Sequence, residues 1–402
     1  MLICIVLDLS PGKTVWSSSF TAWSEQRRLT KSIDADMSTE DSAHRTLYVS
    51  QPDWCAYEGV TCGSESGSSS YASVISIDLS SLNLNGSLPS SMGNFQSLIS
   101  FSISSNSITG SIPSTVGLMS SLVYMTLMSN SLTGTIPSTV DALTALTALY
   151  ISANSITGTI PTSIGMMEAL QFLYLDMNSL TGIIPSSIGD LAFVQALILS
   201  TNSLTGTIPS SIGALTSLQL LYVEANSLIG SIPGSVGDLA LLKELSLSGN
   251  YLTGTIPSSI DALTSLQLLY MNANYLTGTI PSTMTFVQLR EFALSENYLT
   301  GTIPSSIGDM TLLEVLNMFS NSLTGTIPST MSALSFLRVV QLHNNYLTMG
   351  SASTVPVSTF SNYTLNSYGI DLVENCLVFS YGDYRVTATH CMPTSQPTAG
   401  KC

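Results

Sequence analysis

The residue types that carry out most enzyme chemistry are scarce in this chain and do not form recognisable catalytic motifs. Only three histidines occur among 402 residues, at His44, His343 and His390. None lies in a His-Glu-x-x-His zinc pattern, and the chain has no Gly-x-Ser-x-Gly nucleophile motif and no calcium-loop pattern. A histidine without a neighbouring nucleophile is usually a surface residue. We therefore expect a protein that is not an enzyme and needs no cofactor.

The cysteines could bind a metal or form disulfides. They lie near the two ends of the chain, at Cys4, Cys55, Cys62, Cys376, Cys391 and Cys402. No Cys-x-x-Cys pair is present, so this placement favours disulfides that staple the ends over a metal site. Disulfides indicate an oxidising compartment, and the glycosylation sequons at Asn85 and Asn362 agree with one.

The charge balance excludes several classes of partner. Acidic residues number 25 against 10 basic ones, giving a net charge of −15, and charged residues make up only 9% of the chain. Nucleic acids and anionic membrane surfaces are bound through Lys and Arg, so neither is an expected partner. No run approaches the roughly 18 continuous apolar residues of a membrane helix, and we expect no transmembrane segment here.

The middle of the chain is built from a repeated sequence. Asparagines recur every 24 residues, with one step of 23 between Asn274 and Asn297. An earlier unit with Leu82 at the asparagine position brings the number of repeats to 12, over residues 74–349. The repeated asparagines are Asn106, Asn130, Asn154, Asn178, Asn202, Asn226, Asn250, Asn274, Asn297, Asn321 and Asn345.

The pattern inside each repeat predicts one short strand. Around each Leu-x-Leu, apolar residues alternate at a period of two, which is typical of a strand with one buried face. The Gly and Pro that follow end the strand, so the repeats stack as a parallel solenoid. Turning the chain inside a solenoid buries peptide groups that lack ladder partners. Because a carboxamide both donates and accepts, we predict that the asparagines form a structural ladder.

The repeated pattern LxxLxLxxNxLTGxIPxxIGxL, seen for example over residues 218–239, resembles the plant-type leucine-rich repeat. The resemblance implies an α/β-type solenoid: a curved right-handed horseshoe with a parallel sheet on its concave face, a second short sheet from the LTGxIP segment, and capped ends. It also implies ligand or partner binding on the concave side. The same repeat is found in extracellular halves of receptor kinases, in receptor-like proteins and in secreted inhibitors.

The segments outside the repeats are expected to cap the solenoid. The first repeat is preceded by DWCAYEGVTC, which resembles the family's N-terminal cap and implies a Cys55–Cys62 disulfide. After the last repeat, Cys376 and Cys391 flank an alternating segment, and we expect them to pair; the pairing of the two terminal cysteines is left open. The expected division is a variable N-terminal segment with an incomplete signal region and a capping helix (1–50), an N-terminal cap (51–73), repeats (74–349), a C-terminal cap (350–392) and a Pro/Ser/Thr-rich tail (393–402).

Strand alternation also predicts a binding face. Positions −6, −4 and −2, counted back from each asparagine, face the concave solvent. In the middle repeats these columns are aromatic, apolar and mildly acidic, and tyrosine is a favoured interface anchor. They carry no paired Arg or Lys, which disfavours a carboxylate or phosphate ligand. The alternative is that the tyrosines only cover the sheet. The predicted ligand-binding residues are Tyr150, Phe172, Tyr174, Asp176, Tyr222, Glu224, Tyr270 and Asn272.

These observations predict a non-enzymatic recognition module, extracellular or at the cell surface, that binds a protein, peptide or glycan on its concave face. A co-receptor or a second copy of the chain is a further partner to consider. One alternative is the ectodomain of a membrane receptor kinase whose remainder lies outside this chain. A more remote alternative is an ice-binding protein that uses the Thr-Gly-Thr ladders of successive repeats, although Ile183, Ile229 and Ser231 interrupt those ladders.

Overall fold

The computed structural model describes residues 59–63, 73–284, 286–348, 379–381 and 384–386, and its main feature is a 13-stranded sheet. Strand β1 (Val60–Cys62) is antiparallel to the first repeat strand, and the 12 repeat strands run parallel in chain order. The predicted number of repeats and the parallel sheet are thus confirmed. The repeat strands are β2 (Val74–Asp78), β4 (Ser100–Ser102), β6 (Tyr124–Thr126), β7 (Ala148–Tyr150), β8 (Phe172–Tyr174), β9 (Ala196–Ile198), β10 (Leu220–Tyr222), β12 (Glu244–Ser246), β14 (Leu268–Tyr270), β15 (Glu291–Ala293), β17 (Val315–Asn317) and β19 (Val339–Gln341).

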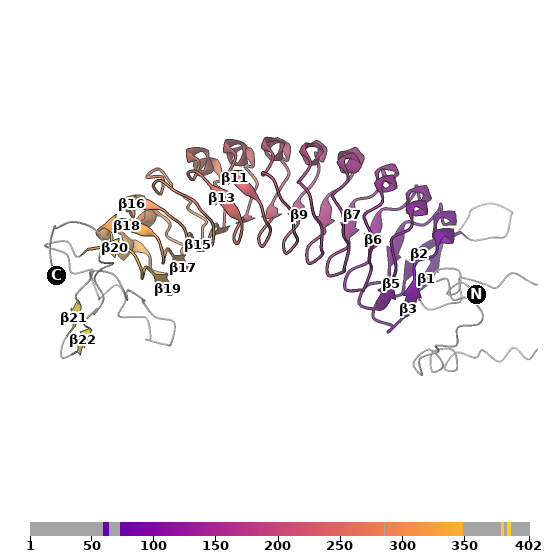
Figure 1. The fold of residues 1–402 in the computed structure, drawn as a ribbon, viewed down its shortest axis with the longest axis horizontal. Helices are drawn as coiled ribbons and strands as arrows, with labels where there is room; N and C mark the ends of the chain where they lie inside the picture. The colour runs from indigo at the N-terminus through magenta and orange to yellow at the C-terminus, as the bar shows by residue number, and fades with distance from the viewer. Residues whose placement is uncertain (1–58, 64–72, 285, 349–378, 382–383, 387–402) are drawn as a thin grey trace, which may run out of the picture.

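Short 3-10 helices form the opposite side of the solenoid. Each follows a proline with φ between −60° and −81°, which suits the start of a helix because the proline ring fixes this angle. Strands stack about 4.8 Å apart while helices need more room, so the stack bends with the strands on its inner rim and the helices on its outer rim (Figure 1). The helices are η2 (Ser90–Asn94), η3 (Ser114–Leu118), η4 (Ser138–Ala142), η5 (Thr162–Met166), η6 (Ser186–Asp190), η7 (Ser210–Ala214), η8 (Gly234–Asp238), η9 (Ser258–Ala262), η10 (Ser305–Asp309) and η11 (Ser329–Ala333).

The expected second sheet is present in separate pieces between the two rims. Strands β3 and β5 pair, β11 pairs with β13, and β16, β18 and β20 form a three-stranded piece, all parallel. Isolated bridges such as Thr135–Thr157 join other repeats. The strands are β3 (Asn85–Ser87), β5 (Ser107–Thr109), β11 (Ile229–Ser231), β13 (Tyr251–Thr253), β16 (Thr300–Thr302), β18 (Ser322–Gly325) and β20 (Tyr346–Leu347), and an antiparallel hairpin follows in β21 (Phe379–Tyr381) and β22 (Tyr384–Val386).

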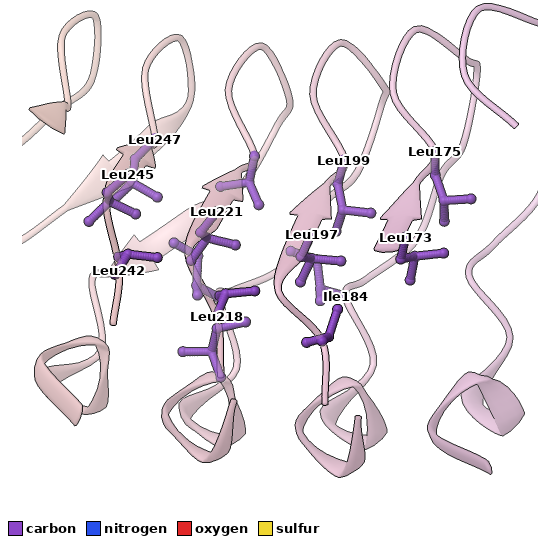
Figure 2. Close-up of a cluster of buried hydrophobic side chains, with 14 of the residues drawn as sticks. Leu173, Leu175, Ile184, Leu197, Leu199, Leu218, Leu221, Leu242, Leu245 and Leu247 are labelled. Atoms are coloured by element: carbon purple, nitrogen blue, oxygen red, sulfur yellow. The ribbon is translucent and has the colours of Figure 1, made fainter. Parts of the chain in front are cut away.

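The core is one continuous column of aliphatic side chains. Leu197 and Leu199 alternate inward from β9 and the turn after it, and both are fully buried. Figure 2 shows that leucines of neighbouring repeats take up equivalent places along the solenoid. In the 23-residue repeat, the described residues between η9 and η10 contain no helix, and the buried ring of Phe286 fills the core there.

The asparagines join each repeat to the one before it. Asn202 Nδ2 donates to the carbonyl oxygens of Leu175 in the preceding repeat, at 3.0 Å, and of Leu199 in its own repeat, at 3.1 Å. Asn202 Oδ1 accepts from the N–H of Leu180 at 2.9 Å. Equivalent bonds are made from Asn106 through Asn345, so each carboxamide satisfies backbone groups that the strand ladder leaves free.

Candidate ligand-binding face

The inner rim carries a cluster of aromatic rings on β7 and β8. Tyr150 and Tyr174 are register partners, and their ring centroids lie 4.8 Å apart in an edge-to-face arrangement. Phe172, at the other end of β8, lies 6.5 Å from the Tyr150 ring. Edge-to-face pairs of this kind are favourable because the positive ring edge meets the negative ring face. The three rings form a compact, partly exposed apolar surface.

Two further tyrosines at position −4, the position of Tyr150 and Tyr174, are hydrogen-bonded to glutamates of the next repeat. The Tyr222 hydroxyl on β10 donates to the Glu244 carboxylate on β12, and the Tyr270 hydroxyl on β14 donates to Glu291 Oε2 on β15 at 2.6 Å. Sequence reasoning missed both glutamates. They occupy position −6, from which only Phe172 was predicted as a binding residue, although the periodicity alone places both glutamates beside the tyrosines.

The surroundings of these tyrosines hold their hydroxyls in the protonated form. Burial raises the pKa of Tyr222 above the ordinary value of 10.0, and the Glu244 carboxylate raises it further. Burial and then Glu291 raise the pKa of Tyr270 in the same way. Burial followed by the Tyr174 hydroxyl raises the pKa of Tyr150. All three side chains therefore remain hydrogen-bond donors well into alkaline solution.

A polar column runs beside the tyrosines at position −2. Ser152 donates to the Asp176 carboxylate of the next repeat, and Ser248 donates to Asn272 Oδ1 at 2.6 Å. Ser200 and Glu224 occupy the equivalent places between these pairs. Ser200 is only 6% exposed, and within the described residues neither its Oγ nor Glu224 Oε2 has a hydrogen-bond partner. These buried polar atoms are left for a ligand or water to satisfy.

The basic residues of the described repeats lie at position −7, at the border of the face. Lys243 Nζ donates to Gln219 Oε1 at 2.8 Å. Arg290 pairs with Glu314 at 2.8 Å, and Arg338 approaches the same carboxylate at 3.5 Å. These ion pairs leave the carboxylates of the Tyr–Glu pairs without a basic partner of their own among the described contacts.

The eight predicted binding residues lie on four repeats of the inner rim, and all are partly exposed. They are not one continuous aromatic strip. Ile198, 8% exposed, separates Tyr174 from Tyr222, and Ser246 separates Tyr222 from Tyr270. Ile198 and Ser246 are both buried although they occupy outward positions.

The remaining predicted sites are described only in part. Cys62 is disulfide-bonded, but Cys55, Cys376, Cys391 and Asn362 lie outside the described residues, so those pairings and that glycosylation site stay predictions. The sequon residue Asn85 is exposed in β3. His343 stacks on Phe319 with centroids 4.6 Å apart.

Among the described residues, no group of three or more His, Cys, Asp or Glu side chains is placed to hold a metal ion. No helix in the same part of the chain is long and apolar enough to cross a membrane.

Comparisons with known proteins agree with the repeat geometry. Leucine-rich repeat family models match residues 97–119, 120–180, 193–215, 241–263, 288–310 and 312–334. The ectodomain of the Arabidopsis thaliana receptor kinase GASSHO1/SCHENGEN3, in complex with CASPARIAN STRIP INTEGRITY FACTOR 2, is 34% identical with a TM-score of 0.73 over 81% of this chain. The chain is a leucine-rich repeat protein of the plant type.

Two further structures resemble this leucine-rich repeat protein. The Arabidopsis receptor kinase HAESA, in complex with the peptide hormone IDA and a co-receptor, is 33% identical with a TM-score of 0.73 over 89% of this chain. A plant ice-binding protein is 29% identical with a TM-score of 0.54, over 64% of this chain and 81% of its own. This protein spans only 41% of the GASSHO1 structure and 55% of the HAESA structure. No curated protein sequence matches it.

Proposed function

We propose that this leucine-rich repeat protein is an extracellular recognition module that binds a basic peptide across its concave face, from β7 to β15. The observation that carries the proposal is the pair of Tyr–Glu contacts beside the aromatic cluster. The similar HAESA structure, which is a complex with a peptide hormone, supports a peptide as the ligand class. A peptide lying across the repeats would contact Tyr150, Tyr174, Tyr222 and Tyr270 in order.

The charges of the face favour a basic ligand. Glu244, Glu291, Asp176 and Glu224 all lie in the three concave columns, and these columns hold no Lys or Arg in any described repeat. Each paired tyrosine occupies one carboxylate oxygen and leaves acceptor capacity on the group. A guanidinium or ammonium group would complete these sites with a charge-assisted hydrogen bond.

Panning a library of random peptides displayed on phage against the full-length chain tests this proposal. We expect enrichment of sequences with Arg and Lys beside an apolar residue. Capture should be lost in the double variant Tyr174→Ala/Tyr222→Ala. It should persist in Phe193→Ala, because Phe193 is an exposed aromatic outside the concave columns. Enrichment of acidic peptides, or unchanged capture by the double variant, would contradict the proposal.

We place the protein outside the cell, secreted or as the ectodomain of a membrane receptor, with a co-receptor or a second copy as its further partner. The disulfide at Cys62 supports an oxidising compartment. The similar structures include membrane receptor kinase ectodomains, which supports the receptor form. Appearance of the epitope-tagged full-length chain in the medium or on intact cells is the expected result, and retention in the cytosol would contradict it.

Ice binding is a second candidate because threonine hydroxyls recur along the second sheet. In most Thr-Gly-Thr segments the first threonine donates its hydroxyl to a glycine carbonyl of the preceding repeat, as Thr205 does to Gly182 at 3.2 Å. The similarity to a plant ice-binding protein supports this candidate. The exposed side chains of Ile183 and Ile229, and the bend of the solenoid, weigh against a flat ice-matching surface (Figure 1). Absence of thermal hysteresis in a concentrated solution of the chain would remove it.

A further inference from the structure

Three tyrosines form an exposed stack that the concave site does not use. Tyr251, Tyr275 and Tyr298 occupy the position after the asparagine in three consecutive repeats, and we call them the tyrosine ladder. Successive ring centroids are 5.9 Å apart with an interplanar angle of 21°. The three side chains are 49%, 44% and 57% exposed. A contiguous row of large exposed rings on a soluble protein usually marks an interaction site.

The backbone fixes the ladder. The N–H of Tyr251 bonds to a carbonyl of the preceding repeat at 2.8 Å, and Tyr275 does the same. The residues that follow, Leu252 and Leu276, are fully buried in the core. Because neighbouring positions in extended chain point to opposite sides, each ring is directed outward from an anchored backbone. The ring row is therefore preorganised, which lowers the entropic cost of binding.

The rings stand farther apart than rings in direct contact. Aromatic carbons in direct contact lie about 3.5–4 Å apart, well short of the 5.9 Å between these centroids. This separation agrees with the exposure of the three side chains. The exposed rings repeat in step with the rungs of the solenoid, at a spacing similar to the length of one pyranose unit in a linear polysaccharide.

The surface around the ladder is uncharged and rich in hydroxyls. We call it the flank face and define it by positions +1, +3 and +5 after each asparagine, which lie on the second sheet between the two rims. No described residue in these three columns is Asp, Glu, Lys, Arg or His. Thr253, Thr277 and Thr300 each follow a ladder tyrosine by two residues, and the nearest charged residue in sequence is Glu296, two residues before Tyr298. Such a surface has nothing to attract a polyelectrolyte.

We infer that the tyrosine ladder is a binding site for a neutral, linear polysaccharide. The aliphatic C–H faces of sugar rings pack on tyrosine rings, and sugar hydroxyls exchange hydrogen bonds with the tyrosine and threonine hydroxyls. A repeating polymer suits a surface that presents the same groups once per rung. This site lies on a different face from the proposed peptide site, so either can exist without the other.

Co-sedimentation of the full-length chain with microcrystalline cellulose, curdlan and mannan tests the inference, with soluble polygalacturonate as a charged polymer for comparison. We expect binding to at least one neutral polymer. The variant to compare is Tyr251→Ser/Tyr275→Ser/Tyr298→Ser. We expect this variant to fold, because serine already occupies the same position in six consecutive earlier repeats, from Ser107 to Ser227. Binding should weaken by about tenfold or more, as expected for the loss of three ring contacts.

Further measurements distinguish polysaccharide binding by the ladder from dimerisation and from ice binding. The variant Phe193→Ser removes an exposed aromatic side chain elsewhere and should bind as the wild type does. Equal binding by the triple variant, or binding to polygalacturonate alone, would overturn the inference. So would a wild-type dimer that the triple variant converts to monomer, because the ladder would then be an interface between copies. Thermal hysteresis that the triple variant abolishes would reassign the ladder to ice.

Discussion

At the scale of single residues, the solenoid depends on a few positions that repeat in every rung. The asparagine carboxamides satisfy buried backbone groups of two repeats at once. The residue before each asparagine has φ between +52° and +62°, although it is glycine only at Gly249. Side chains at the other ten positions, such as Ala225, adopt a conformation that costs L-residues about 1–2 kcal/mol. The repeat tolerates this strain because the surrounding hydrogen bonds hold the turn.

Replacing a ladder asparagine should destabilise the fold. Asn202→Ala leaves the Leu180 N–H unsatisfied and removes one of the two carboxamide bonds to the Leu175 carbonyl, the other coming from Asn178. We therefore expect the free energy of unfolding to fall by about 1–3 kcal/mol. Urea unfolding followed by circular dichroism measures it. The neighbouring exposed Ser203→Ala serves as the control and should change stability by less than about 0.5 kcal/mol. Equal stability of the two variants would contradict the role given to the carboxamide.

The glycine before Asn250 offers a test of backbone strain alone. A Cβ at Gly249 would meet no atom closer than 3.5 Å, so Gly249→Ala introduces no clash. It should still lower the free energy of unfolding by about 1 kcal/mol because φ is +62°. The reverse change, Ala225→Gly, should raise it by a similar amount. Chemical denaturation of both variants is the measurement, and changes of the same sign would show that strain does not govern this turn.

The raised pKa values of the concave tyrosines predict how stability depends on pH. Because the pKa of Tyr222 and Tyr270 lies above 10.0 in the folded chain, the folded state keeps protons that the unfolded state releases above pH 10. The free energy of unfolding should therefore fall as pH rises beyond 10. In Tyr222→Phe/Tyr270→Phe the slope of this fall should be smaller. Urea unfolding at several alkaline pH values measures the slope, and an identical slope in the double variant would refute the assignment.

At the scale of elements, the close packing of rungs depends on glycines in the Thr-Gly-Thr segments. Gly278 has φ of +77°, and a Cβ there would lie 2.7 Å from Thr255 Cγ2 of the preceding repeat. The threonine methyl therefore fills the space that the missing side chain leaves. A side chain at position 278 would collide with this methyl and push the two LTGTIP segments apart.

A double variant separates the two roles of that glycine. Gly278→Ala should destabilise the fold by about 2–4 kcal/mol, through backbone strain together with overpacking. In a Thr255→Ser background the methyl is gone, so the same change should cost only the strain, about 1–2 kcal/mol. Thermal or urea unfolding of the four proteins in this cycle gives the coupling. Additive effects would show that the methyl does not fill the space.

At the scale of the whole molecule, much of the architecture could be predicted because the repeat fixes it. A 24-residue period with Leu-x-Leu sets the strand order, register and inner rim, and Asn274 and Asn297 already mark the irregular repeat. The side-chain contacts of the site did not follow in the same way. The bonds from Tyr222 to Glu244 and from Tyr270 to Glu291 depend on how far a ring reaches across to the next strand.

Other features were visible in the sequence without being interpretable from it. The strained position before each asparagine is glycine only at Gly249 and otherwise carries Ser, Ala, Met, Thr, Glu or Asn, so the usual glycine signal is missing from most repeats. The tyrosine ladder is a plain column in the sequence. Its stacking and exposure depend on the spacing of the second sheet, which one strand period does not determine. The repeated sequence pattern thus predicts the scaffold. The contacts on its two binding surfaces depend on how far the side chains extend and on the spacing between rungs.

The central claim is that the concave face recognises a basic peptide through carboxylates held by tyrosines. Its most direct test is the affinity of the most enriched basic peptide for wild type and for Glu244→Gln/Glu291→Gln, measured by isothermal titration calorimetry. Glutamine keeps the shape and can still accept from the tyrosine hydroxyls, so only the charge is removed. The account predicts affinity weaker by about tenfold or more, with Phe193→Ala unchanged. An affinity within about twofold of wild type would contradict it.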